Sequence, residues 1–289
     1  MKKWTASAIL ALCLLLPLMT TEAEAAATVD SGTCGTNLTW VLDSDGVLTI
    51  NGIGSMTNWT LSLTSMPWYK HKDKVTSVVV NEGVQTIGDC AFAYCSNLSS
   101  VTIPSSVLKI GVVTGAAYSP FRGCGGLTSI DIASGNENYS SEDGVLFAGN
   151  KTVLVRYPAG KDTTSYSIPD GVSCIDDGAF EDCRKLTSVT IPNSVGTINE
   201  QAFIRCEGLT SITIPNSVTR IDEHTFSVCT GLTSITIPNS VEIIGYSAFS
   251  NCRGLTSVIL SSGLDSISSR AFAECTSLTS VTFPKSVTC

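Results

Sequence analysis

A 23-residue unit repeats through most of the chain after residue 75 and limits the possible folds more than any other feature. The unit that starts at Leu186 reads LTSVTIPNSVGTINEQAFIRCEG, and the next two units, from Leu209 and Leu232, are nearly identical to it. A fixed period of this length is typical of solenoids, in which each unit packs only against its neighbours. The same frame also fits 75–97, 98–126 with six extra residues, 163–185, and the units that start at Leu255 and Leu278.

Apolar residues recur at fixed positions of the unit, counted from its leading Leu. In the second of the three units they are Leu209, Ile212, Ile214, Val218, Ile221, Phe226 and Cys229, at positions 1, 4, 6, 10, 13, 18 and 21. The alternation across positions 3 to 6 predicts a strand with one buried face. Pro215 at position 7 has no N–H to donate, so strand pairing ends there. The segment Ala-Phe-x-x-Cys at positions 17 to 21 suits one helical or 3₁₀ turn that directs the Phe side chain inward.

One such unit cannot bury its own apolar edge, but stacked copies share a continuous core. The sequence therefore predicts a β-rich repeat solenoid of short parallel strands joined by short helical or 3₁₀ turns. Seven of the nine phenylalanines fall at position 18, and stacking would align them in one column. They are Phe92, Phe121, Phe180, Phe203, Phe226, Phe249 and Phe272.

Twelve cysteines in an exported chain normally indicate a disulfide framework. Seven of them occupy position 21, however, so they form a ladder along the stack: Cys95, Cys124, Cys183, Cys206, Cys229, Cys252 and Cys275. If the first 27 residues are cleaved as a signal peptide, Cys13 is lost and eleven cysteines remain. An odd number of cysteines cannot all form disulfides within one chain. We expect the ladder cysteines to be small buried residues with weak S–H donors. Oxidation between neighbouring thiols is the alternative.

The first 27 residues are typical of a cleaved signal peptide. Lys2 and Lys3 precede the apolar run from Ala8 to Leu16, and small residues near Ala25 offer cleavage sites. The run is shorter than the roughly 20 apolar residues that a membrane span needs. The sequence thus predicts a secreted or cell-surface protein with no membrane insertion after cleavage. With 15 Lys and Arg against 23 Asp and Glu, the remaining chain is a poor candidate for nucleic-acid binding.

Residues 28–74 do not follow the repeat and are expected to form an N-terminal β-rich capping module. Two apolar segments, 37–42 and 46–50, flank the sequence Asp-Ser-Asp-Gly at 43–46, which predicts a β-hairpin. Half of a calcium loop is the alternative for these acidic residues, although the remaining ligands are missing. The module is expected to cover the edge of the first coil.

Residues 136–161 interrupt the repeats within the solenoid region 75–289. Two short strands, 144–147 and 152–155, flank the sequence Ala-Gly-Asn-Lys and predict a second β-hairpin. Insertions on one face of a solenoid are often functional. A binding protrusion and a structural wedge are both compatible with this sequence.

The unit LTSVTIPxSVxxIxxxAFxxCxx resembles the BspA-like leucine-rich repeats, also called the Treponema pallidum type. The insert is similar to an element of such arrays, here Tyr139, Ser141, Asp143 to Phe147 and Tyr157 to Lys161. The segment 31–40 together with 67–69 resembles the module that precedes these repeats in proteins of gut Firmicutes. The resemblance implies a curved solenoid and, for some members, adhesion to host extracellular-matrix proteins or to other cells. The resemblance does not identify a binding site in this chain, because members of the family share no fixed binding motif.

The strand face at positions 3 and 5 is the candidate binding surface, because alternation turns its Ser and Thr side chains outward. In the three regular units these residues are Ser188, Thr190, Ser211, Thr213, Ser234 and Thr236. The alternative is that the hydroxyls only keep a strand face soluble. A uniform face distinguishes partners poorly, so specificity is expected from irregular places: Asp131, the insert from Tyr139 to Tyr157, and the aromatic residues Trp59, Trp68 and Tyr69.

Catalysis is not expected. Acidic pairs such as Asp176-Asp177 lie at turn positions of the repeat, and no Ser/His/Asp set, phosphate loop, cofactor motif or metal cluster stands out. The sequence predicts a non-catalytic protein that binds extracellular proteins or glycoproteins. The alternative is a targeting or stalk region of a larger exported protein, since the sequence stops twelve residues into a repeat.

Overall fold

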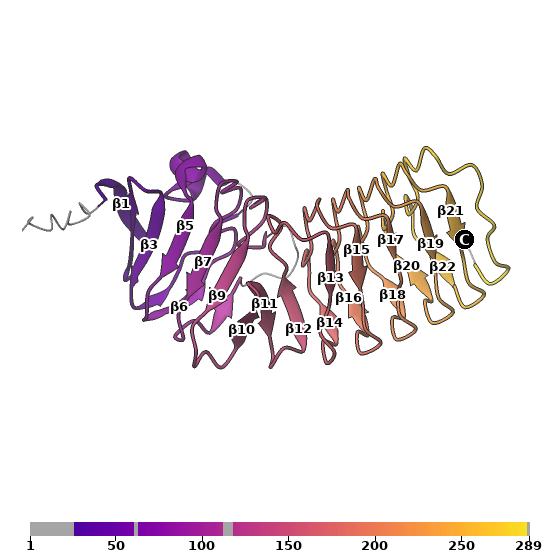
Figure 1. Ribbon diagram of the computed structural model, residues 1–289, viewed down its shortest axis with the longest axis horizontal. Helices are drawn as coiled ribbons and strands as arrows, with labels where there is room; N and C mark the ends of the chain where they lie inside the picture. The colour runs from indigo at the N-terminus through magenta and orange to yellow at the C-terminus, as the bar shows by residue number, and fades with distance from the viewer. Residues whose placement is uncertain (1–25, 61–62, 112–117, 288–289) are drawn as a thin grey trace, which may run out of the picture.

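The computed structural model describes residues 26–60, 63–111 and 118–287, and shows an elongated stack of coils (Figure 1). Two short 3₁₀ helices, η1 (Leu63–Ser65) and η2 (Tyr69–Lys74), lie wholly within these ranges, and Tyr118 is a further 3₁₀ residue. All other regular structure is strand, as expected for a β-rich solenoid. The predicted signal peptide lies almost wholly outside the described residues.

The coils form two layers of parallel strands. The first layer uses positions 3 to 6 of each unit: β3 (Val47–Gly52), β5 (Ser77–Val80), β7 (Ser100–Ile103), β9 (Ser129–Ile132), β13 (Ser165–Ser167), β15 (Ser188–Thr190), β17 (Ser211–Ile212), β19 (Ser234–Thr236) and β21 (Ser257–Ile259). The second layer lies near positions 12 and 13: β4 (Gly54–Ser55), β6 (Val84–Ile87), β8 (Lys109–Ile110), β14 (Cys174–Ile175), β16 (Thr197–Ile198), β18 (Arg220–Ile221), β20 (Ile243–Ile244) and β22 (Ser266–Ile267). Ser188 pairs with Ser211, which confirms the 23-residue register.

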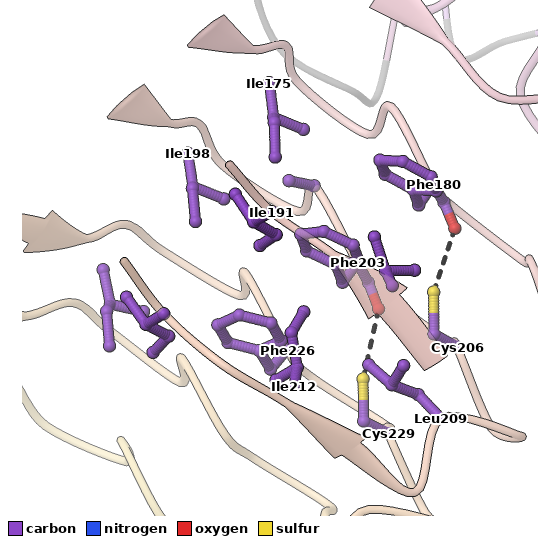
Figure 2. Close-up of a cluster of buried hydrophobic side chains, with 14 of the residues drawn as sticks. Ile175, Phe180, Ile191, Ile198, Phe203, Cys206, Leu209, Ile212, Phe226 and Cys229 are labelled. Carbon is purple, nitrogen blue, oxygen red and sulfur yellow. Dashed lines mark hydrogen bonds between the residues drawn. The ribbon is translucent and has the colours of Figure 1, made fainter. Parts of the chain in front are cut away.

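The phenylalanines of position 18 stack along the axis, but in two columns and not in the single predicted one: Phe92 with Phe121, and Phe180 through Phe272 (Figure 2 shows part of the second). The rings of Phe203 and Phe226 have centroids 5.3 Å apart and planes 11° apart, and Phe226 and Phe249 repeat this geometry at 5.3 Å and 10°. Two other aromatic residues begin the columns. Trp68 stacks on Phe92, and Tyr157 stacks on Phe180.

The turn at positions 17 to 21 differs from the helical or 3₁₀ turn that the sequence predicts. Gln201 and Arg205, at positions 16 and 20, have φ values of 57° and 59° in the left-handed region, and the chain passes through consecutive tight turns. The N–H of Phe203 donates to the carbonyl of Thr225 on the next coil, whereas the N–H of Ala202 donates to Asn199 of its own turn. A helix directs all its N–H groups along itself, so it cannot supply these alternate bonds between coils.

The cysteines of the ladder are buried, and their side chains are free thiols. The Sγ atom of Cys206 donates to the carbonyl of Phe180, 3.1 Å away, and Cys229 repeats this contact with Phe203 at 3.2 Å (Figure 2). The cysteines among the described residues are free, which agrees with small buried residues that act as weak S–H donors. Burial raises the pKa of the Cys229 thiol to about 12, so little thiolate forms at neutral pH.

The predicted N-terminal hairpin is present as β2 (Leu38–Asp43) and β3, and β1 (Thr28–Gly35) pairs with its outer edge. The Asp43 carboxylate accepts hydrogen bonds from the backbone N–H groups of Asp45 and Val47, at 3.0 and 2.9 Å. These bonds are those of a tight turn, the first of the two interpretations of the acidic residues. β3 then pairs in parallel with β5, so the sheet of the N-terminal module continues into the first layer of the repeats.

The insert contains the predicted hairpin, β11 (Val145–Ala148) and β12 (Val153–Arg156), together with a strand that the sequence did not indicate, β10 (Tyr139–Glu142). β12 pairs in parallel with β14, so the hairpin is part of the second layer. The side chains of Leu146 and Phe147 are fully buried. Of the two interpretations of the insert, the geometry therefore favours the structural wedge over the protrusion.

Candidate binding surface

The six predicted surface residues lie on one exposed face of the first layer. Strands β15, β17 and β19 bury Val189, Ile212 and Ile235, at 6%, 8% and 2% exposure, because alternate side chains of a strand point to opposite sides. The flanking residues therefore point to solvent. The exposed set is Ser188, Thr190, Ser211, Thr213, Ser234 and Thr236.

A neighbouring row of hydroxyls has a structural role that the sequence analysis missed. The Oγ1 atoms of Thr187, Thr210 and Thr256, at position 2, donate to the carbonyl one coil earlier at 3.0, 3.1 and 3.0 Å. By contrast, the side chains at positions 3 and 5 of these coils make no hydrogen bond with any other described residue. Their donors and acceptors are available to a partner.

The surface is uncharged over its regular part and changes at its ends. Ile259 is 60% exposed at position 5, where the three preceding coils carry Thr. This apolar residue at a hydroxyl position is a signal that the sequence analysis missed. At the other end Asp131, also at position 5, is exposed and accepts a hydrogen bond of 2.8 Å from the Ser129 hydroxyl. The predicted surface residue Asp131 is thus accessible.

The two tyrosines of the insert do not extend this surface. Tyr157 is 1% exposed, and its hydroxyl hydrogen-bonds to the Thr163 hydroxyl at 2.5 Å. The prediction that Tyr157 offers a binding contact is wrong, because it occupies the ring column where other coils carry Phe. Tyr139 is half-buried, and its hydroxyl accepts the Ile110 N–H at 3.0 Å. Burial raises the pKa of the Tyr139 hydroxyl.

The aromatic residues of the N-terminal module are also core residues. Trp59 is 5% exposed and Trp68 is fully buried, with their ring centroids 5.3 Å apart in an edge-to-face arrangement. The Trp68 indole donates to the carbonyl of Ala91 at 2.9 Å. These two rings hold the module on the first coil and are not available to a partner, contrary to the prediction.

Among the residues that the structure describes, no group of three or more His, Cys, Asp or Glu side chains is arranged to hold a metal ion. No helix in the same part of the chain has the length and apolar character needed to cross a membrane.

Comparison with known proteins identifies the repeats. The model of the BspA type leucine rich repeat region matches in six copies, over residues 65–150, 159–258 and 196–289. No curated protein sequence gives a significant match.

Solved structures of bacterial repeat proteins share the fold. A leucine-rich repeat protein from Eubacterium ventriosum is 25% identical, with a TM-score of 0.51 over 89% of this chain and 92% of that one. A leucine rich cell surface protein from Faecalibacterium prausnitzii is 21% identical, with a TM-score of 0.54 over 86% and 93% of the two chains. The pneumococcal vaccine antigen PcpA is 16% identical, with a TM-score of 0.59 over 87% of each. Since the family model covers most of the sequence, this chain belongs to the BspA-type leucine-rich-repeat family.

Proposed function

We propose that this chain is a non-catalytic secreted or cell-surface protein that binds an extracellular protein or glycoprotein along the exposed face of the first layer. The observation that carries the proposal is the contrast between two adjacent rows of hydroxyls. Those at position 2 are used up by bonds between coils. Those at positions 3 and 5 of the three regular coils, from Ser188 to Thr236, remain exposed and without partners among the described residues.

The shape of this surface suits a partner that spans several coils. Each coil offers two outward hydroxyls, and Ser188, Ser211 and Ser234 occupy equivalent places in register. A single hydroxyl contributes little to affinity, because its bond to a partner replaces a bond to water. Contacts on three or more coils are therefore needed, and Ile259 supplies an apolar contact on the coil that follows them. Asp131 offers a charge at the same position on β9, on the other side of the insert.

The proposed biological role is adhesion to host matrix or to other cells. The family membership supports a place outside the cytoplasm, as does the similarity to a cell surface protein of Faecalibacterium prausnitzii. The signal peptide proposed for residues 1–27 supplies the export route.

The experiment that tests the surface compares two pairs of substitutions in the chain from residue 28 onward. Thr190→Lys with Thr213→Lys places two charges on the proposed surface. Thr197→Lys with Thr219→Lys places the same charges on the same coils, at exposed positions on β16 of the second layer and directly before β18. Binding to immobilised fibronectin, laminin, collagen and mucin is measured for both variants and for the unsubstituted chain.

We expect the first pair to reduce binding to the partner about tenfold or more, since each buried lysine charge costs free energy without a counter-ion. The second pair is expected to bind as the unsubstituted chain does. Equal loss in both variants would assign the effect to net charge. Binding that survives the first pair would exclude this surface.

A further inference from the structure

The buried side chains form two separate cores instead of one continuous core. One includes the residues from Cys34 to Ile130, and the other includes those from Tyr157 to Cys275. We call the coils around the first core the first stack and those around the second core the second stack. The break coincides with the insert, which lies between them in Figure 1.

The backbone ladders break at the same place. In the first layer the parallel pairing runs from β3 to β9 and starts again only at β13. In the second layer it runs from β4 to β8 and starts again at β12. Among the described residues no strand pair carries either ladder across the insert. Each ladder is also interrupted once within the second stack, between β16 and β18 and between β17 and β19, but there the ring column continues from Phe203 through Phe226 to Phe249.

The central strand of the insert has one side chain in the first core and its neighbours in the second. On β11, Leu146 packs into the first core, whereas Val145 and Phe147 pack into the second. All three are fully buried. Strand alternation thus gives the insert two apolar faces, and each face closes one core.

The start of the second stack repeats the construction of the N-terminal module. In both places antiparallel strands come first, and the last of them pairs in parallel with the first strand of the coils, as β3 does with β5 and β12 with β14. An aromatic ring other than Phe begins the column in both, Trp68 in one and Tyr157 in the other. Antiparallel strands of this kind act as a cap, because they end the exposed edge of a sheet.

Between the two ring columns lies a charged side chain. Arg156 is 2% exposed and donates from Nη2 to the carbonyl of Phe121, the last ring of the first column, at 3.3 Å. From Nη1 it donates to the carbonyl of Gly178 at 2.7 Å and to the Glu181 carboxylate at 3.3 Å. Arg156 therefore joins the two ring columns by polar bonds where coils elsewhere have stacked rings. The Gly160 N–H adds a backbone bond to the carbonyl of Leu127 at 2.7 Å.

We infer that the insert ends the first stack and starts the second, so that the solenoid consists of two capped units that open independently. In a solenoid, coils are coupled through their nearest-neighbour interfaces. At the insert the ring column and the buried core are interrupted together with the ladder, whereas stacked rings and one continuous core bridge the ladder breaks within the second stack. Cooperative unfolding therefore stops at the insert.

The test is amide hydrogen exchange, followed by mass spectrometry, on the chain from residue 28 onward with two adjacent substitutions. Leu146→Ala removes a side chain from the first core, and we expect exchange at β7 and β9 to accelerate about tenfold or more while β14 and β16 change less than about twofold. Phe147→Ala removes one from the second core, and the opposite pattern is expected. Each variant is the control for the other, because both alter the same strand.

A uniform acceleration across both stacks in either variant would overturn the inference. The unsubstituted chain gives a second readout that does not depend on how well the variants fold. With increasing low concentrations of denaturant, the amides of the first stack and those of the second are expected to converge on two different opening free energies. Convergence of all amides on a single value would also overturn it.

Discussion

The thiol of Cys229 donates a hydrogen bond to the carbonyl oxygen of Phe203, 3.2 Å away on the preceding coil. The same contact recurs between Cys252 and Phe226 at 3.1 Å and between Cys275 and Phe249 at 3.1 Å. Cysteine at position 21 thus fills a small buried space and adds a second hydrogen bond to a carbonyl that already accepts a backbone N–H within its own turn, as the Phe203 carbonyl does from Cys206 at 3.2 Å. This gives a physical reason for cysteine at a position where no disulfide forms among the described residues.

Native ladder thiols are expected to resist alkylation. Cys183 and Cys229 are 1% and 0% exposed, and burial raises the pKa of each thiol to about 12. Because the thiolate is the nucleophile, both access and ionisation are low at pH 8. Labelling with iodoacetamide, mapped by mass spectrometry, should modify the half-exposed Cys174 before either ladder residue. Rapid labelling of Cys229 in the folded protein would contradict this assignment.

The free energy of unfolding is expected to fall as the pH rises above about 9. Burial raises the folded-state pKa of Cys124, Cys183 and Cys229 from 9.0 to about 12. Below pH 9 these thiols are neutral in both states, so the full stability is present. Between pH 9 and 12 they ionise only when unfolded, and each lowers the free energy of unfolding by about 1.4 kcal/mol per pH unit.

Urea unfolding at several pH values measures this slope. Replacing one ladder residue, Cys229→Ser, removes one titrating thiol and should make the slope shallower by one proton. The slope of that variant at pH 7 serves as the control, since neither protein titrates a ladder thiol there. An unchanged alkaline slope would show that other groups cause the loss of stability.

Phe226→Ala is expected to cost about 3–5 kcal/mol of stability, as large-to-small changes in a packed core do. Phe226 is fully buried between two stacked rings, with centroids 5.3 Å away on both sides. Phe272, at the same position of a later coil, is only partly buried, so Phe272→Ala should cost clearly less. Thermal and urea unfolding of the two variants measure the difference. Equal losses would contradict the assigned burial.

The fold was predictable because an apolar residue recurs at each buried position in several repeat units. Position 18 holds Phe in seven units, so a column of stacked rings follows from the spacing alone. The turn was not predictable in the same way, because the left-handed conformations at Gln201 and Arg205 are imposed by bonds to the next coil and not by residue type. Local sequence does not encode a conformation that depends on the neighbouring coil.

The surface was only partly predictable. Strand alternation correctly predicted that Ser211 and Thr213 point outward. It could not show that the hydroxyl of the adjacent Thr210 is instead hydrogen-bonded to the preceding coil. Tyr157 was mistaken for a surface residue because the insert lacks the repeat frame, so its equivalence to position 18 was not apparent. Both errors concern contacts between coils, which a single unit of sequence does not contain.

Two threonines three residues apart should differ in their contribution to stability. Thr210→Val removes a hydrogen bond of 3.1 Å to the carbonyl of Thr187, and we expect it to lower the free energy of unfolding by about 0.5–1.5 kcal/mol. Thr213→Val is expected to stay within about 0.5 kcal/mol, because its hydroxyl is exposed and has no partner among the described residues. Urea unfolding of both variants decides the point, and the reverse order would exclude the position 2 ladder as a stabilising feature.

The buried ion pair of Arg156 and Glu181 should be more costly to break than to replace. Both side chains are nearly inaccessible, at 2% and 1% exposure, and Glu181 also accepts a bond of 2.6 Å from Arg205. Glu181→Leu leaves the Arg156 charge in the core, so we expect a loss of about 3–5 kcal/mol. Adding Arg156→Met removes the stranded charge, and part of the loss should be recovered. Glu181→Leu also removes the contacts of Glu181 with Arg205 and Arg122, at 2.6 and 3.8 Å, but these are lost in the single and the double variant alike. Urea unfolding of Glu181→Leu, Arg156→Met and the double variant gives the coupling free energy, and strictly additive losses would mean that the two residues do not stabilise each other.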